Sequence, residues 1–276
     1  MDRIRLIASD MDATLLDEQS QLPADFEETI HALAELGIRF APASGRPLYT
    51  LEAMFPTLQD ELVFIGDNGG AIRWKGQNLF TSEMSPEGWR ALNRLTREQG
   101  DIAVLCGLES AYVERPFAVH DAVLRHFYTK IEYVDRLEDV TAPADKFTIY
   151  LPQHNAQQAY DTVYASQRSI YSVAVAGECW VDIMNPGVHK GAALQTLGQL
   201  WGLPSESIMA FGDTYNDAEM LRTAKYGFLM ENGSVPLRQK VPFLAPSHRE
   251  AGVMQILQKV LAQNGCVCPE DFVPAH

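Results

Sequence analysis

The chain has 276 residues, of which 46% are hydrophobic and 21% are charged, a composition that excludes a disordered or fibrous protein and predicts a globular one with a sizeable core. Its 36 Asp and Glu residues outnumber its 22 Lys and Arg residues, so the formal net charge is −14. This charge repels nucleic acids and anionic membranes, so neither is expected as a partner, and any bound phosphate needs a metal ion or a local basic group.

The sequence contains no pattern typical of a secretion signal or a membrane span. The first sixteen residues carry several charges, and no run of about 18 uncharged apolar residues follows. The cysteines, Cys106, Cys179, Cys266 and Cys268, are too few and too irregularly spaced for a disulfide framework or a four-ligand zinc site. These features favour a cytoplasmic location, with Cys266 and Cys268 in a frayed tail. The oligomeric state, monomer or homodimer, leaves no readable mark.

The first 82 residues alternate between strand and helix patterns. A mostly apolar run ends at Ser9 and Asp10, which suits a strand that is buried on both faces of a parallel sheet. The expected elements are, in order, a strand over 4–8, a helix over 26–36, a strand over 38–43, a short helix over 47–55, a strand over 62–65, and a hairpin of 71–74 with 78–80. The first three elements form a βαβ unit.

The pattern changes between residues 83 and 185. The expected elements there are a helix over 86–99, strands over 102–105 and 111–114, a helix over 117–127, a strand over 147–151, a helix over 155–167, and a hairpin of 171–175 with 179–184. This mixture predicts an inserted α+β domain of roughly 100 residues, which is within the usual domain range.

The alternation of strand and helix resumes after residue 186. The expected elements are a helix over 190–201, a strand over 208–211, a helix over 216–223, a strand over 226–230, and a terminal helix over 252–262. The sequence therefore predicts an α/β protein in which residues 1–82 and 186–276 form a doubly wound, Rossmann-like core with a parallel sheet. The inserted domain interrupts this core.

Polar residues gather at the expected carboxyl ends of the core strands, where open α/β sheets bind ligands. They come from four separate regions: Asp10 and Asp12; Ser44, Gly45 and Arg46; Lys190; and Asp213, Asn216 and Asp217. Taken singly, each region has a simpler explanation, such as a capping turn at Asp12 or at 212–217, a helix N-cap at Ser44, or a solvated Lys190. Their joint position at one sheet edge favours a shared site.

The residue types at this edge suit phosphoryl transfer. Asp10, Asp12 and Asp213 offer the hard oxygen donors that Mg²⁺ prefers, and crowded carboxylates need such a cation. One carboxylate could then attack phosphorus while a second moves the proton of the leaving oxygen. Lys190 and Ser44 would hold the transferring oxygens.

The segments 10–16, 43–47, 189–191 and 212–217 resemble the four motifs of the haloacid dehalogenase-like hydrolases. The inserted domain is similar to the large α/β cap of their Cof-type phosphatases. The first motif departs from the family pattern, because Ala13 stands where the family usually has Gly. If that position needs a positive φ, the Cβ of alanine costs about 1 kcal/mol or more.

The resemblance implies a role for each matching residue. Asp10 would be the nucleophile and Asp12 the general acid and base, which also offers Mg²⁺ its backbone carbonyl. Lys190 would neutralise the phosphoryl group and orient Asp10. Ser44 would bind the phosphoryl group, with Gly45 beside it in the substrate- or phosphate-binding segment, and Asn216 would contact phosphate or substrate. Asp213 would bind the metal, and Asp217 would hold Lys190 or a water of the metal. Arg46 and Asn68 are second-tier candidates near the entrance.

The function that follows is a Mg²⁺-dependent phosphatase that hydrolyses small phosphorylated metabolites, sugar phosphates or related phosphomonoesters, through an aspartyl-phosphate. Two alternatives stay open: a phosphomutase on the same scaffold, and a catalytically weak metabolite-binding regulatory protein. The cap should close over the site. Its charged residues near the expected entrance, Glu114, Arg115, His120, Lys146, Glu178 and Asp182, are interpreted as solvated surface groups rather than substrate contacts.

Overall fold

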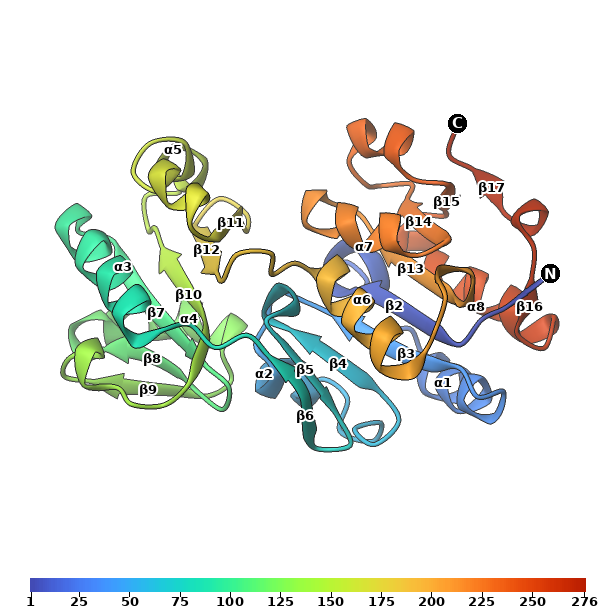
Figure 1. Ribbon diagram of the computed structural model, residues 1–276, viewed down its shortest axis with the longest axis horizontal. Coiled ribbons are helices and arrows are strands. Elements are labelled where there is room, and N and C mark those ends of the chain that lie inside the picture. The colour runs from blue at the N-terminus through green and yellow to red at the C-terminus, as the bar shows by residue number, and fades with distance from the viewer.

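A computed structural model describes residues 1–276. The chain forms two large sheets that lie side by side, with both termini on the side of the larger sheet (Figure 1). The larger sheet has, in spatial order, β17 (Val273–Pro274), β15 (Phe243–Ala245), β14 (Tyr226–Met230), β13 (Ile208–Gly212), β2 (Leu6–Asp10), β3 (Arg39–Ala43), β4 (Val63–Gly66), β5 (Ala71–Trp74) and β6 (Gln77–Thr81). The six strands from β15 to β4 are parallel.

Helices cover both faces of this sheet. They are α1 (Phe26–Glu35), α2 (Leu48–Ala53), α6 (Lys190–Trp201), α7 (Ala218–Thr223) and α8 (Gly252–Ala262). Ile7 of β2 packs into a cluster with residues of α1, α2 and α8, whereas Leu6 and Ala8 pack against residues of α6 and α7. Because successive strand residues point to opposite faces, one apolar strand serves both layers. This is the doubly wound arrangement that the sequence predicts, and we call it the core.

The smaller sheet is built only from residues between 102 and 184. Its strands are, in spatial order, β11 (Ser172–Val175), β12 (Trp180–Met184), β10 (Ala144–Tyr150), β7 (Ile102–Gly107), β8 (Ala111–Glu114) and β9 (Ile131–Val134). The helices α3 (Pro86–Gln99) and α5 (Ala156–Asp161) pack on one face, and α4 (Asp121–Phe127) packs on the other. We call this part the cap.

The chain passes from core to cap between Thr81 and Pro86 and returns between Met184 and Lys190. The predicted boundaries near 82 and 186 fall within these two connections (Figure 1). That residues 83–185 form an independent domain stays a prediction.

Local sequence signals set the ends of the long helices. The Ser85 hydroxyl oxygen accepts a hydrogen bond from the Gly88 N–H (3.1 Å), Pro86 opens α3, and Gly100 ends it at a φ of 75°. At α6 the Nδ1 atom of His189 accepts from the Ala192 N–H (3.1 Å). Such caps satisfy backbone groups that a helix leaves unpaired at its ends, and both helices have the bounds that the sequence predicts.

Two predicted helices of the cap were too long. Residues 117–127 divide into a 3₁₀ turn over Arg115–His120 and α4. The predicted helix over 155–167 ends at Asp161, as α5, and a 3₁₀ turn covers Ala165–Ser169. The side chain of Tyr164 turns inward after α5, where it is fully buried and its hydroxyl donates to Asp101 Oδ2 (3.1 Å). This tertiary contact overrides the helical pattern.

Strands at the sheet edges were also missed. β9 was not expected, because its residues are mostly half-buried and give a weak apolar signal. The sequence suggested a frayed C-terminal tail, and this expectation was wrong. In the structure β16 (Cys266–Val267) pairs with β1 (Asp2–Arg3), and β17 pairs with β15. Val267 is fully buried there. None of the helices combines the length and the apolar character that a membrane crossing requires.

Candidate active site

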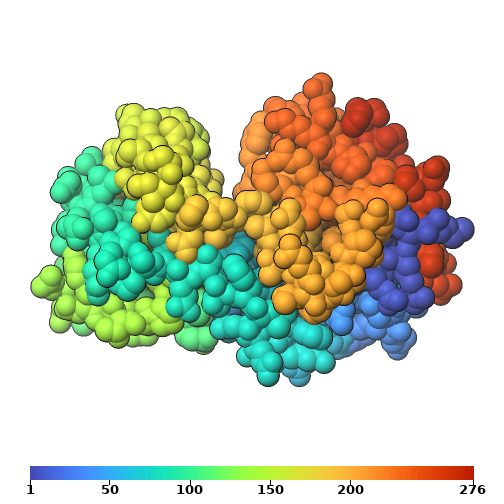
Figure 2. All heavy atoms as spheres, viewed as in Figure 1, coloured from blue at the N-terminus to red at the C-terminus, as the bar shows by residue number.

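A cavity of about 840 Å³ lies between the core and the cap. Figure 2 shows a hollow between the yellow part of the surface, which belongs to the cap, and the orange part, which belongs to the core. The core residues that line the cavity include Asp10, Asp12, Ser44, Gly45, Arg46, Asn68, Asp213 and Asn216. Eight of the predicted site residues therefore face one space at the carboxyl edge of the parallel sheet.

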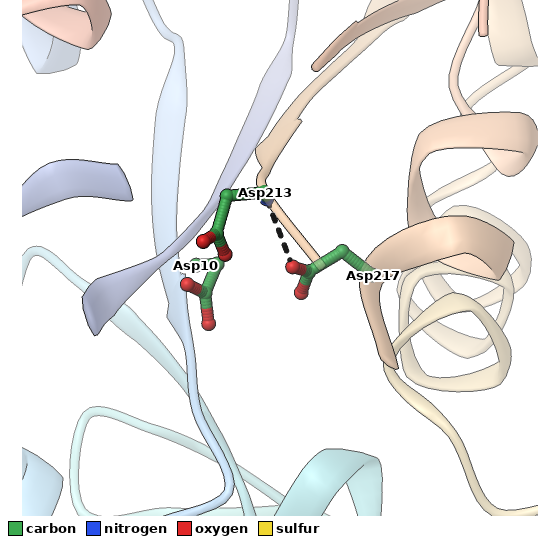
Figure 3. A group of neighbouring side chains, drawn as sticks. All are labelled: Asp10, Asp213 and Asp217. Atoms are coloured by element: carbon green, nitrogen blue, oxygen red, sulfur yellow. Dashed lines mark hydrogen bonds between the residues drawn. The ribbon is translucent and has the colours of Figure 1, made fainter. Parts of the chain in front are cut away.

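Three buried carboxylates meet at this edge (Figure 3). Asp10 ends β2 and Asp213 follows β13, and these neighbouring strands run parallel with Phe211 opposite Ser9. Asp217 completes the group, in which carboxylate oxygens of all three residues lie within 4.8 Å of one another. The parallel register thus brings together residues that are about 200 positions apart in the sequence.

Lys190 is the cation of this cluster. Its side chain is fully buried at the start of α6, and its ammonium donates hydrogen bonds to the carboxylate of Asp10 and to Asp217 Oδ1 (2.7 Å). Neither Lys190 nor Asp217 is among the residues that line the cavity. In this structure Lys190 therefore holds the Asp10 carboxylate from beneath the cavity surface.

Asp217 uses both carboxylate oxygens within the protein. Its Oδ2 accepts hydrogen bonds from the backbone N–H groups of Asp213 and Thr214 (both 3.1 Å), and the bond from Asp213 is drawn in Figure 3. Gly212 permits this approach, since a Cβ there would lie 2.4 Å from the Cβ of Asp217. The 212–217 segment is thus a capped turn and also part of the acidic cluster, so the two interpretations of this motif are compatible.

Burial and mutual repulsion shift the titration of the cluster. Burial first, and then the neighbouring Asp217, raise the pKa of Asp10 to about 7. Burial and the nearby Asp10 raise the pKa of Asp213 to about 8. The carboxylates in turn raise the pKa of Lys190. Three carboxylates face one ammonium, so the ionised cluster has surplus negative charge, and its oxygen donors fit a hard divalent cation such as Mg²⁺.

A pH-dependent stability follows for the metal-free protein. Because the folded pKa values of Asp10 and Asp213 lie above the ordinary 3.8, the folded state binds more protons than the unfolded state between about pH 4 and pH 8. We expect the melting temperature in EDTA to fall as the pH rises through 7 and 8. Excess MgCl₂ should raise it more at pH 8 than at pH 5, because fewer protons compete for the carboxylates.

Thermal melts of the wild type and of Asp213→Asn check this expectation. The substitution should remove most of the increase in melting temperature that MgCl₂ causes at pH 8, because the carboxylate of Asp213 becomes a neutral amide. An equal Mg²⁺ effect at both pH values, or the same effect in the variant, would contradict the assignment of this cluster as a cation site.

Asp12 lies apart from the three clustered carboxylates. Its side chain is 56% exposed, and its Oδ1 accepts a hydrogen bond from Arg46 Nη2 at 2.9 Å. The metal role implied for Asp12 was through its backbone carbonyl, so a carboxylate that lies away from the acidic cluster is compatible with that expectation. Arg46 lines the same cavity and fixes the direction of that carboxylate.

Ala13 has the left-handed conformation that glycine prefers, with a φ of 60° and a ψ of 15°. An alanine Cβ in this region costs about 1 kcal/mol relative to glycine. We therefore expect Ala13→Gly to raise the free energy of unfolding by about 1 kcal/mol, measured by urea denaturation. The substitution Ala34→Gly in helix α1 is the matched control and should lower it by a similar amount. A loss of stability in Ala13→Gly would contradict this account.

Ser44 follows β3, next to the end of β2 where Asp10 lies opposite Ala43. Its Oγ accepts a hydrogen bond from the Arg46 N–H (3.1 Å), so the hydroxyl hydrogen is free to donate into the cavity. Ser44 is not the N-cap of α2, because Pro47 occupies that position. The N-cap interpretation was wrong, and the hydroxyl is available to a ligand.

Two cap residues interpreted as solvated surface charges are buried instead. Lys146 of β10 is 2% exposed and Asp182 of β12 is 3% exposed, and both line the cavity. They share one face of the cap sheet with Thr148, which lies opposite Asp182. One sequence pattern could have indicated this burial: within β10 the polar residues alternate with the apolar residues Phe147 and Ile149, which belong to the opposite face. The other four charged cap candidates do not line the cavity.

The fold and this site define an α/β enzyme with carboxylates at the edge of a parallel sheet and a cap above them. A model of the haloacid dehalogenase-like hydrolase family matches residues 7–257. The chain belongs to this family.

Named relatives and solved structures agree with this assignment. The chain is 32% identical to the 5-amino-6-(5-phospho-D-ribitylamino)uracil phosphatase YbjI of Escherichia coli, over 94% of this chain and 96% of that protein. It is 31% identical to the HMP-PP phosphatase of Cronobacter sakazakii, over 87% and 89% of the two chains. The crystal structure of SMU.1108c from Streptococcus mutans matches with a TM-score of 0.85 and 28% identity, covering 94% of this chain and 99% of that one.

Proposed function

We propose that this protein is a Mg²⁺-dependent phosphatase that hydrolyses small phosphorylated metabolites, sugar phosphates or related phosphomonoesters, through an aspartyl-phosphate on Asp10. The observation that carries the proposal is the buried group of Asp10, Asp213 and Lys190 beside the free hydroxyl of Ser44, in a cavity of about 840 Å³. The phosphatase names of the relatives support the same reaction.

Asp10, Asp213 and the backbone carbonyl of Asp12 would hold Mg²⁺, with Asp217 in the same acidic cluster. Bound there, the cation supplies the positive charge that lets an anionic phosphoryl group approach these carboxylates. Lys190 keeps the Asp10 carboxylate in one orientation, and its ammonium favours the ionised, nucleophilic form.

The reaction proceeds in two displacements. A carboxylate oxygen of Asp10 attacks phosphorus and forms an O–P bond, while the bond between phosphorus and the leaving oxygen breaks. The Asp12 carboxyl gives its proton to that leaving oxygen. Asp12 then takes a proton from a water molecule, whose oxygen attacks the phosphorus, so that inorganic phosphate leaves and the Asp10 carboxylate is restored. Ser44 donates its hydroxyl hydrogen to a phosphoryl oxygen in both steps.

The cap end of the cavity favours a substrate with a ring. Aromatic side chains of Phe127, Tyr160 and Trp180 line it together with polar groups of the core. Aromatic side chains pack well against flat rings and the apolar faces of sugars. The relative YbjI is named for a phosphorylated ribitylaminouracil, and this compound therefore belongs in any substrate panel.

Phosphate release from such a panel tests the proposal. The panel contains sugar phosphates, nucleotides, 5-amino-6-(5-phospho-D-ribitylamino)uracil and p-nitrophenyl phosphate, each with MgCl₂ and with EDTA. We expect release from at least one compound only with the cation. Transfer of labelled phosphate into a product sugar would instead indicate a phosphomutase. Tight ligand binding without turnover would indicate a regulatory protein.

A further inference from the structure

A buried ion pair joins the cap to the core beside the Ser44 loop. Lys146 of cap strand β10 donates a hydrogen bond from Nζ to the backbone carbonyl of Gly45 (2.6 Å). The same Nζ lies 3.0 Å from Asp67 Oδ1, and both side chains are at most 2% exposed. Gly45 directly follows Ser44, so a cap residue holds the backbone of the loop that carries the free hydroxyl.

A second buried contact crosses the same interface. Asp182 of β12 accepts a hydrogen bond at Oδ2 from Asn68 Nδ2 (3.0 Å). Its other oxygen, Oδ1, accepts from the Thr148 hydroxyl (2.7 Å), which fixes the carboxylate within the cap sheet. We call these five residues, Lys146 and Asp182 of the cap with Gly45, Asp67 and Asn68 of the core, the clasp.

The clasp includes part of a strained turn of the core, residues 67–69. Asp67 and Asn68 have φ values of 51° and 54°, and Gly69 follows at 98°, so three consecutive residues are left-handed. A Cβ on Gly69 would lie 2.7 Å from the carbonyl oxygen of His189, the residue that precedes Lys190. Left-handed residues other than glycine persist only where surrounding contacts hold them. The cap adds two such contacts, the ion pair of Lys146 with Asp67 and the hydrogen bond from Asn68 to Asp182, to those made within the core.

The strained turn in turn supports the Ser44 loop. The Asn68 N–H donates to the Ser44 carbonyl (2.9 Å), and the Asp67 N–H donates to the Arg46 carbonyl (3.0 Å). The Asn68 side-chain amide packs so closely on Gly45 that a Cβ there would lie 3.2 Å from Asn68 Oδ1. Backbone hydrogen bonds and close packing therefore couple the loop to the turn, and the cap contacts both.

We propose that Lys146 and Asp182 are positioning residues for phosphoryl transfer: through the clasp, the docked cap holds the strained turn and thereby aims the Ser44 hydroxyl at the phosphoryl group. This inference rests on the proposed function. Buried ion pairs add little stability compared with apolar packing of the same volume. Stability therefore does not explain why this interface contains charged residues, whereas a role in positioning the loop does. Cap docking then completes the phosphate-binding loop.

Amide hydrogen exchange tests the mechanical part without any need for turnover. We expect Lys146→Met to speed exchange of the Asp67 and Asn68 amides at least about tenfold, because their acceptors lie in the released loop. Glu109→Gln is the matched control: it removes the partly exposed cap-core ion pair between Glu109 and Arg73 (2.6 Å), which does not contact the loop. This control should leave the two amides unchanged.

Kinetics test the chemical part. With p-nitrophenyl phosphate and MgCl₂, Lys146→Met should raise KM and the inhibition constant of inorganic phosphate about tenfold, the size expected when a hydrogen bond to a charged group is lost. A merely structural role would lower kcat through a smaller active fraction and leave both constants unchanged. Ser44→Ala should make the Lys146→Met effect on the inhibition constant much smaller, because both changes remove the same contact.

Asp182→Asn is the milder variant in case Lys146→Met does not fold, and it should show the same pattern with smaller changes. Unchanged amide exchange and an unchanged inhibition constant in a folded Lys146→Met or Asp182→Asn protein would overturn the inference. Faster exchange spread evenly over the chain would also overturn it. If the wild type releases phosphate from no substrate, the proposed function fails, whereas the exchange experiment still decides whether the cap holds the loop.

Discussion

Replacing Asp10 by Asn is expected to lower phosphate release at least about a thousandfold, because an amide oxygen is a poor nucleophile and the first displacement needs the carboxylate. The substitution keeps the size of the side chain and an oxygen that can accept the hydrogen bond from Lys190. The loss should therefore appear in kcat, with the folded structure retained in circular dichroism. Steady-state phosphate release with the best substrate of the panel measures it.

Asp60→Asn is the matched control, since Asp60 is exposed and makes no side-chain hydrogen bond or ion pair. It should retain the full rate. In the wild type, acid quenching during turnover should leave the phosphoryl label on the peptide that contains Asp10. Substantial activity in Asp10→Asn, or a label on another peptide, would place the nucleophile elsewhere and contradict the mechanism.

The core could be predicted from sequence because its signals are local. The buried strand β2 begins as one apolar run, and α6 has the bounds that its pattern of apolar residues predicts. The sequence alone predicted that Asp10 and Asp213 lie together, because parallel strands place their carboxyl ends at one edge. Residues at the ends of buried parallel strands are thus the part of this site that sequence patterns define best.

The cap contribution to the site could not be predicted in the same way. Lys146 and Asp182 lie in separate strands, and only the antiparallel pairing of β10 with β12 brings them to one face of the sheet. Their burial depends on the core loops docked against them, which is a contact between distant segments. A composition rule that places charged residues at the surface therefore failed at two cap positions that contact the core, Lys146 at Gly45 and Asp182 at Asn68.

Ala13 shows a different limit of prediction from sequence. The motif indicated that the position favours glycine, yet the sequence does not reveal a φ. The structure gives 60°, so the alanine is tolerated in a strained conformation next to Asp12. Strain of this kind is common at functional sites, and here it comes from a single methyl group in the loop that follows the proposed nucleophile.

Lys190→Met is expected to cause a large loss of stability. Lys190 is the one cation hydrogen-bonded to Asp10 and Asp217, and its side chain is fully buried. Removing one partner of a buried pair costs about 3–5 kcal/mol, because the remaining charges have no compensation. We expect that loss at pH 8 in EDTA, measured by urea denaturation.

The loss should shrink toward pH 5. Asp10 and Asp213 have folded pKa values of about 7 and 8, so at pH 5 both are protonated in the folded state and need no counter-charge. In the unfolded state both carboxyls have the ordinary pKa of 3.8. Without the Lys190 ammonium their folded pKa values rise further, so the difference in free energy of unfolding between variant and wild type grows as the pH rises through 7 and 8. Excess MgCl₂ at pH 8 should restore part of the stability.

Lys225→Met is the control for this last prediction. Lys225 pairs with Asp2 at the surface (2.6 Å), where its side chain is 38% exposed, and exposed pairs contribute at most about 1 kcal/mol. Its substitution should change stability little, and by the same amount at both pH values. If Lys190→Met were no more destabilising than Lys225→Met, or equally destabilising at pH 5 and pH 8, the buried carboxylates would not depend on Lys190 for their charge compensation.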